Sequence, residues 1–212
     1  MSQWSTIPQA TIRPWHNHTS SFARVLLTSL CGLLYCVLVL GSNRARADEK
    51  AKPKKEVTIE TKSYDEAMET LKGLKGKVVV MDCWSTSCAP CKKEFHHLVE
   101  LSEKHSADKV QCVSLNFDFI GVDPIEESIP KIKKFLVEQK AANVLNIVST
   151  DEDSLLYEKL QFPAIPAVFV YDQEGKLVKR FDNSDPKEKK FTYEDVQKMV
   201  TDLLKSKAKT GG

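Results

Sequence analysis

Hydrophobic and polar positions follow one another in blocks that predict alternating strands and helices. Continuous apolar runs bounded by polar residues indicate buried strands, and apolar residues spaced three and four apart indicate amphipathic helices. The predicted strands cover 57–59, 77–83, 110–116, 144–148, 167–171 and 177–181, and the predicted helices cover 64–74, 91–105, 124–141, 151–160 and 193–204. This order predicts an α/β fold with a mixed sheet covered by helices.

The first 47 residues carry the pattern of a targeting signal. An apolar run at 25–40 is preceded by Arg13 and Arg24 and followed by an Ala-x-Ala site at 45–47. This order of basic, apolar and small-residue regions is typical of a secretory signal peptide, here cleaved before Asp48.

An uncleaved membrane anchor is the alternative for the same segment. The apolar run at 25–40 is shorter than the ~20 residues that a spanning helix prefers, although it approaches the lower limit. Either interpretation places the following domain outside the cytoplasm, in the periplasm or another extracytoplasmic space. Any contact with the membrane would be made by this segment alone.

Residues 48–56 are rich in lysine, contain Pro53 and lack apolar periodicity, which predicts a flexible linker. Residues 57–212 then form one domain, long enough to bury a core without disulfide support. The formal charge of +2 is uneven because residues 1–47 hold four arginines and no acid, leaving 27 basic and 29 acidic residues in the remainder. Since basic and acidic residues are interspersed there, the sequence excludes a nucleic-acid-binding stripe.

The junction between the predicted strand at 77–83 and the predicted helix at 91–105 carries the most informative motif, Cys88-Ala-Pro-Cys91. Two intervening residues allow the two sulfurs to form an intramolecular disulfide. A cysteine at a helix N-terminus has its thiolate stabilised by free amides and the helix dipole. Pro90 fits the first helical turn, where its missing N–H costs nothing. The motif therefore predicts Cys88 as the attacking thiol and Cys91 as the resolving thiol.

A Cys-x-x-Cys pair can also be half of a zinc site, which requires two further Cys or His ligands at close spacing. The nearby candidates are His96, His97 and Cys112, and no second pair is present. The sequence therefore favours redox chemistry over zinc, and the two histidines are interpreted as ordinary helix residues.

Two carboxylates lie beside the motif. Asp82 interrupts an apolar strand, where burial would raise its pKa and fit it to move a proton at neutral pH. Glu94 follows Cys91 by three residues, about one helical turn. Two interpretations of Glu94 remain open, an influence on the protonation of Cys91 and a solvated helix position.

The other cysteines divide into two groups. Cys31 and Cys36 lie in the targeting segment, whereas Cys83 and Cys112 lie in predicted strands. A lone cysteine in a strand behaves as a small buried hydrophobe. An accessory disulfide between Cys83 and Cys112 is the alternative.

A second signal is the Ile165-Pro166 dipeptide immediately before the predicted strand at 167–171. Proline cannot donate a ladder hydrogen bond, so its position before a buried strand needs a reason. A cis Ile165–Pro166 bond would supply one. It would leave the backbone of Ile165 open to pair with an extended substrate segment next to the cysteines.

Together these signals resemble the thioredoxin superfamily and, within it, the extracytoplasmic TlpA/ResA-like branch, over residues 57–205. The segment from Trp84 to Phe95, WSTSCAPCKKEF, is similar to the active-site line of that branch. Ile165-Pro166 with the following apolar strand is similar to its cis-proline strand. The predicted helix at 124–141 is similar to the insertion that is typical of the branch.

The resemblance implies a thioredoxin fold, with a central mixed β-sheet flanked by helices and an extra helix inserted after the second core strand. It implies that Cys88 attacks and Cys91 resolves, that Asp82 matches the buried acid of thioredoxin, and that Glu94 matches the acidic residue of the ResA-like branch. The residues implied in substrate binding are Trp84, Ala89, Pro90, Ile165 and Pro166.

Three positions depart from the pattern of the branch. Ser87 replaces a second tryptophan before the motif, and His96 stands where many members have a helix-kinking proline. Ser114 falls where thioredoxin has a lysine near its buried acid, so the surroundings of Asp82 are left undefined.

The resemblance implies disulfide exchange with exported proteins and no organic cofactor. Pro90 and Ile165 resemble the residues of the reducing members, which implies a reductase of protein cysteines, with apocytochrome c before haem attachment as one candidate substrate. Such a reductase depends on a membrane electron donor. The alternatives are a net oxidant or isomerase, and a metal-handling or redox-sensing binding protein that uses the same thiols.

Overall fold

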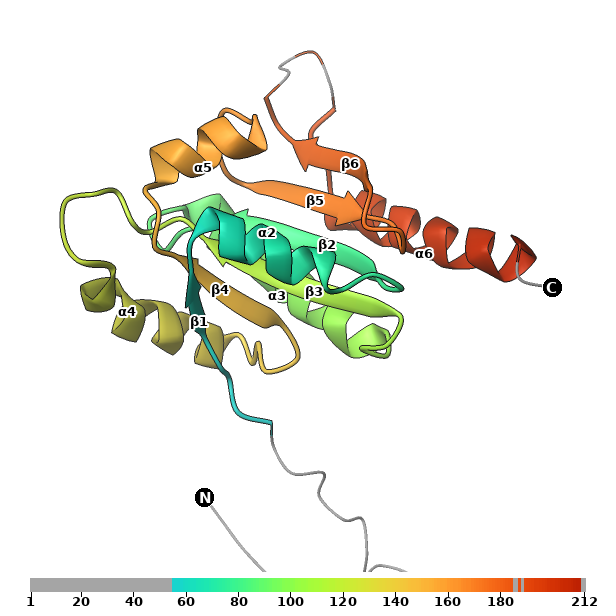
Figure 1. The fold of residues 1–212 in the computed structure, drawn as a ribbon, viewed down its shortest axis with the longest axis horizontal. Coiled ribbons are helices and arrows are strands. Elements are labelled where there is room, and N and C mark those ends of the chain that lie inside the picture. Colours follow the sequence, from blue (N-terminus) through green and yellow to red (C-terminus); the bar gives the residue numbers. More distant parts are fainter. Residues whose placement is uncertain (1–54, 185–186, 188, 211–212) are drawn as a thin grey trace, which may run out of the picture. The chain divides into compact units, whose positions relative to one another are not determined.

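Six strands form one mixed sheet in the order β1-β4-β3-β2-β5-β6 (Figure 1). Neighbouring strands from β1 to β2 in this order are parallel, whereas β5 is antiparallel to β2 and β6 is antiparallel to β5. The strands are β1 (Glu60–Lys62), β2 (Val78–Trp84), β3 (Val110–Asn116), β4 (Leu145–Ser149), β5 (Ala167–Tyr171) and β6 (Leu177–Asp182). The helices are α2 (Tyr64–Lys72), α3 (Ala89–Lys104), α4 (Ile125–Glu138), α5 (Asp153–Leu160) and α6 (Tyr193–Thr210).

The computed structural model describes residues 55–184, 187 and 189–210. The predicted targeting segment at 1–47 and most of the predicted linker at 48–56 lie outside the described residues. Within those ranges, no helix has the length and apolar character needed to cross a membrane.

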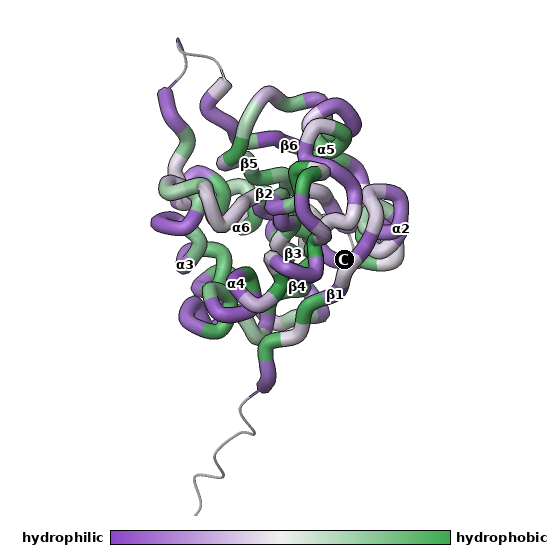
Figure 2. The backbone as a smooth tube through the Cα atoms, turned by 90° about the vertical axis from the view of Figure 1, so that its left-hand side faces the viewer, coloured by the Kyte–Doolittle hydropathy of each residue, from purple (hydrophilic) through white to green (hydrophobic). Residues whose placement is uncertain are grey.

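Hydrophobic side chains fill two separate cores, one on each face of the sheet. Alternate residues of β2 point into different cores: Val78 and Val80 pack with α3, α4 and α6, whereas Val79 and Met81 pack with α2 and α5. Figure 1 shows α2 in front of the sheet and α3 behind it. Because β2 is covered on both faces, its sequence is apolar at every position except Asp82. Along the backbone, hydrophobic segments gather at the central strands (Figure 2).

The order of strands and helices predicted from the sequence is confirmed, and the arrangement is the thioredoxin fold that the resemblance implies. The inserted helix is α4, which lies between β3 and β4. The predicted strand at 57–59 is wrong, because β1 begins three residues later, at Glu60. Its pairing with β4 starts at Glu60 and Ile147, and this pairing sets where the strand begins. Val57 is buried in the core without belonging to the strand.

Asn146 joins β4 to three neighbouring segments through its buried side chain. Its Nδ2 lies 3.1 Å from each of the carbonyl oxygens of Thr58, Ala141 and Val144. Its Oδ1 accepts a 3.0 Å hydrogen bond from the hydroxyl of Ser114 on β3. Buried polar groups that lose such partners destabilise a fold strongly.

We therefore expect Asn146→Ala to lower the free energy of unfolding by about 2 kcal/mol, because it leaves buried carbonyl groups without a donor. Urea unfolding of both proteins measures the change. The matched control is Asn143→Ala, which removes an exposed side chain from the loop before β4. Equal losses in the two variants would contradict a structural role for the Asn146 amide.

Candidate active site

The two motif cysteines lie at the junction between β2 and α3. Cys88 is the N-cap of α3, and its sulfur accepts a hydrogen bond from the backbone N–H of Cys91 at 3.2 Å. The two sulfurs are joined in a disulfide. Pro90 occupies the first helical turn, as the sequence predicts.

The two cysteines differ in their accessibility. Cys88 is half-buried, whereas Cys91 is 2% exposed and belongs to the core between the sheet and α3. A partner sulfur can therefore approach Cys88 directly and cannot reach Cys91 first. This difference fits the predicted division into an attacking and a resolving thiol.

A groove with a volume of about 760 Å³ opens beside Cys88. Ala89, Pro90 and Ile165, three of the residues implied in substrate binding, line it together with Cys88. The Ile165–Pro166 bond is cis, as predicted from the sequence. An extended peptide in this groove would contact the residue before the cis-proline and the cap of α3.

A second cavity, of about 480 Å³, is lined by Pro90 and Cys91 of the motif. It brings together Asp82, Cys91, Glu94, Pro166 and Tyr193 from four separate segments of the chain. The sequence predicted the first four of these as site residues. Their convergence on one cavity places a carboxylate close to the resolving cysteine.

Asp82 is 4% exposed, and burial raises its pKa to about 7. The hydroxyl of Tyr193 donates a hydrogen bond to the Asp82 carboxylate, which lowers that pKa and so opposes the effect of burial. Burial and the nearby Asp82 raise the pKa of Tyr193, so its hydroxyl remains a donor. The result is a carboxyl group that exchanges a proton near neutral pH.

Tyr193 lies in the site, and the sequence did not reveal it. Its pattern indicated only an apolar position at the start of the last helix, and the bond to Asp82 spans 111 residues of sequence. Ser114, at the position where thioredoxin has a lysine, pairs with Asp82 in the β2–β3 register but gives its hydroxyl to Asn146. Tyr193 therefore supplies the polar partner of the buried acid in this chain.

Glu94 lies at the edge of the cavity that contains Cys91 and is also partly exposed to solvent. Its side chain is 46% exposed, with one oxygen 3.5 Å from His97 Nε2 and the other 3.9 Å from Lys93 Nζ. It also lines the cavity beside Cys91. Glu94 is thus a partly solvated carboxylate on the wall of the site.

Trp84 lies beneath the site and has no exposed surface. Its ring centroid is 5.1 Å from that of Phe95 and 4.8 Å from that of Phe135. The aromatic cluster packs α3 and α4 against the end of β2. This placement does not fit the implied contact with substrate, because the indole is enclosed by the core.

Cys83 and Cys112 are free and buried, as expected of small hydrophobic residues. They belong to different cores on opposite faces of the sheet, and burial raises the pKa of both thiols. The alternative of an accessory disulfide between them is therefore wrong.

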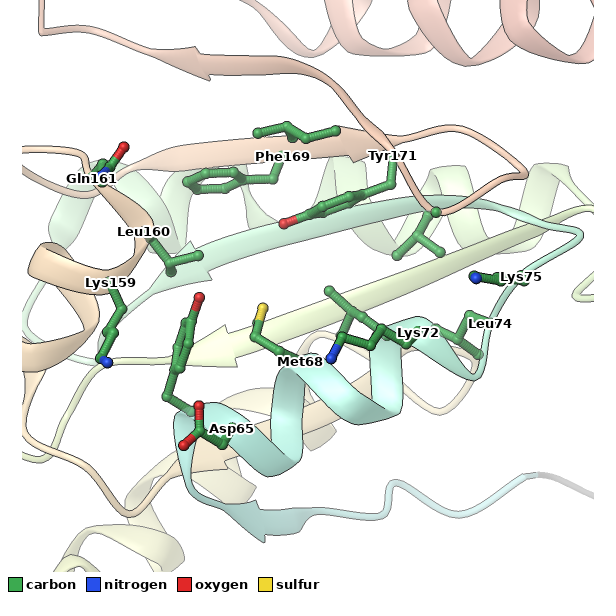
Figure 3. A pocket seen from close by; sticks show the side chains of 15 residues that line it. Asp65, Met68, Lys72, Leu74, Lys75, Lys159, Leu160, Gln161, Phe169 and Tyr171 are labelled. Carbon is green, nitrogen blue, oxygen red and sulfur yellow. The ribbon is translucent and has the colours of Figure 1, made fainter.

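A further cavity, of about 530 Å³, lies on the α2 side of the sheet (Figure 3). Met68 of α2 faces Phe169 and Tyr171 of β5 across it, with Lys72 and Lys159 at its edges. None of its lining residues is a cysteine. The redox chemistry therefore belongs to the α3 side, where the motif and the buried acid meet.

Comparison with known proteins identifies the family of this chain. The redoxin family profile matches residues 47–200. "Thiol-disulfide oxidoreductase ResA" of Bacillus cereus (strain ZK / E33L) is 28% identical over 58% of this chain and 65% of its own length. The protein of the same name from Bacillus thuringiensis subsp. konkukian (strain 97-27) is 26% identical over 81% of this chain and 92% of its own.

A crystal structure of a thioredoxin-like superfamily protein aligns with 63% of this chain and 84% of its own, with a TM-score of 0.50 and 20% sequence identity. At this identity the likeness concerns the fold alone. The family match covers more than half of the sequence and includes β2, the cysteine motif and the cis-proline strand. The chain belongs to the redoxin family, within the thioredoxin superfamily and similar to its TlpA/ResA-like members.

Proposed function

We propose that this protein is a thiol–disulfide oxidoreductase that exchanges disulfides with other proteins through Cys88 and Cys91. The observation that carries the proposal is the pairing of a half-buried Cys88 at a helix N-terminus with a buried Cys91 beside Asp82. The names of the ResA relatives support the same activity.

The reducing cycle begins with the dithiol. The Cys88 thiolate attacks one sulfur of a substrate disulfide, which forms a mixed disulfide and releases the other substrate sulfur as a thiolate. Cys91 then attacks the sulfur of Cys88, which releases the second substrate thiol and leaves the Cys88–Cys91 disulfide. Two electrons have passed to the substrate, and a second dithiol must return them before the next cycle.

Asp82 serves as the base for the second half of this cycle. Cys91 must lose its proton to attack, and the Asp82 carboxyl group lies in the same cavity with a pKa of about 7. A base with a pKa near the working pH is the most effective proton acceptor. Tyr193 is a positioning residue, because its hydrogen bond orients the carboxylate and favours its ionised form.

The substrate is an extended, cysteine-containing segment of a protein. The groove beside Cys88 is open and is lined by Ala89, Pro90 and Ile165, which supports binding of a main chain rather than of a small cofactor. Pro166 lines the neighbouring cavity that contains Cys91, and Pro90 lines both.

The direction of exchange in this proposal is reduction of exported proteins. Export is supported by the basic, apolar and Ala-x-Ala order of residues 1–47. Pro90 between the cysteines and Ile165 before the cis-proline support the reducing direction through the resemblance to reducing members. The cycle requires a membrane electron donor, and apocytochrome c is the candidate substrate. A net oxidant or isomerase is the alternative and would share all these residues.

Trapping of the mixed disulfide tests the proposed activity. Reduced Cys91→Ser should accumulate a covalent complex with an oxidised protein such as insulin, because the second attack is absent. Cys88→Ser should form no such complex, because Cys91 is buried. Non-reducing gels and mass spectrometry measure the adduct. A complex formed through Cys91 in the Cys88→Ser protein would contradict the assigned roles.

The rate of resolution should depend on pH through Asp82. Because the base must be ionised, we expect the rate to rise as pH increases through about 7, the pKa of Asp82. Asp82→Asn should lower the rate at neutral pH by roughly 100-fold and remove this step in the profile. Tyr193→Phe removes a hydrogen bond that lowers the Asp82 pKa. In this variant the rise in rate should therefore occur at higher pH. Stopped-flow measurement of substrate-thiol release follows each profile.

Tyr64→Phe is the matched control for the Tyr193 variant, since Tyr64 lines the cavity on the opposite side of the sheet. Its profile should match that of the unmodified protein. If Tyr193→Phe slowed the reaction equally at every pH, the hydroxyl would have a purely structural role and the assignment would fail.

A further inference from the structure

Two histidines and a glutamate gather on α3, in the part of the helix that follows the cysteine motif. One potential ligand atom from each of His96, His97 and Glu100 lies within 4.8 Å of the others. Glu100 follows His96 by four residues and His97 by three, and both spacings place side chains on the same side of a helix.

The contacts of the two imidazoles leave one nitrogen of each ring facing a possible metal partner. His96 Nδ1 lies 2.9 Å from the Lys93 carbonyl oxygen, so this nitrogen donates and Nε2 keeps its lone pair. His97 Nε2 lies 3.5 Å from a Glu94 oxygen, and its Nδ1 lies 3.1 Å from a Glu100 oxygen. In metal sites the second ring nitrogen is held in this way by a carbonyl or a carboxylate.

We propose that His96, His97 and Glu100 bind one zinc ion, with water in the fourth position. Imidazole ligands favour zinc, copper and nickel over magnesium and calcium, and three protein ligands with one open position are a common zinc arrangement. The ligand atoms are His96 Nε2, His97 Nδ1 and a Glu100 oxygen. His97 Nδ1 already lies 3.1 Å from a Glu100 oxygen, and a Glu94 oxygen lies 3.5 Å from the other nitrogen of the His97 ring.

The site lies at the rim of the catalytic cavity. His97 lines that cavity together with Asp82 and Cys91, and its ring centroid is 5.4 Å from that of Tyr193. Zinc would therefore hold the His97 ring against the residue that supports the buried acid. The zinc proposal does not rest on the proposed function, because none of the ligands is a thiol.

Zinc titration of the full chain tests the site. The Cys88–Cys91 disulfide is kept closed and accessible thiols are alkylated, so that thiolates do not compete for the metal. Competition with a chromophoric zinc chelator measures the affinity. His96→Gln should weaken zinc binding roughly tenfold or more, because it removes a ligand. Glu100→Gln should weaken binding in the same direction.

Matched controls separate this site from other ligands of the chain. His105→Gln changes the C-cap of the same helix, and Glu103→Gln changes an exposed acid nearby; both should bind zinc as tightly as the unmodified protein. His16 and His18 are present in every variant, so any zinc that they bind adds equally to each titration. Equal affinity in His96→Gln and His105→Gln, or no binding at submillimolar zinc, would overturn the proposal.

Disulfide exchange gives an independent readout. Without zinc, His96→Gln should reduce insulin at the unmodified rate, because His96 does not line either cavity of the active site. Loss of zinc binding with intact exchange supports a separate metal site. A protein that binds zinc through His96 but performs no exchange would overturn the proposed activity and leave the metal site standing.

Discussion

Strand β2 pairs with β3 on one edge and with β5 on the other, and all seven of its residues are buried. This burial fixes the direction in which the chain leaves the sheet, so the motif cysteines lie at the start of α3. The β5 pairing brings the segment after Pro166 alongside β2. The same strand carries Asp82 into the core, where α6 brings Tyr193 to it. The site therefore depends on β2 more than on any loop.

The cost of burying a carboxyl group explains much of the chemistry. An ionised acid in a low-dielectric core is unfavourable, which raises the Asp82 pKa to about 7. The Tyr193 hydroxyl limits this shift, so the group remains able to lose and accept a proton near neutral pH. A buried lysine would favour the ionised form of Asp82 through its positive charge. The neutral phenol of Tyr193 favours that form through one hydrogen bond, which is a weaker and more directional interaction.

Features with a local signal could be predicted from the sequence. Strands β3 and β5 have the predicted bounds because apolar runs with polar ends define them, and the Cys88 cap and the cis Ile165–Pro166 bond follow from short motifs. Features that depend on tertiary contacts could not be predicted from the sequence. Pairing with β4 decides where β1 begins, and the partner of Asp82 is an aromatic residue 111 positions away. The resemblance assigns Trp84 to substrate binding, whereas its ring is buried in the core. A motif gives the order of residues along the chain and does not show which of them are covered by other elements.

The redox midpoint of the Cys88–Cys91 pair tests the central claim most directly. The full chain is equilibrated across defined ratios of reduced and oxidised dithiothreitol, and thiol alkylation reports the fraction reduced, with Cys88→Ser as the control. A reductase that needs an electron donor should have a midpoint near or below about −270 mV, the value of thioredoxin. A midpoint near about −120 mV would contradict the reducing direction and identify an oxidant.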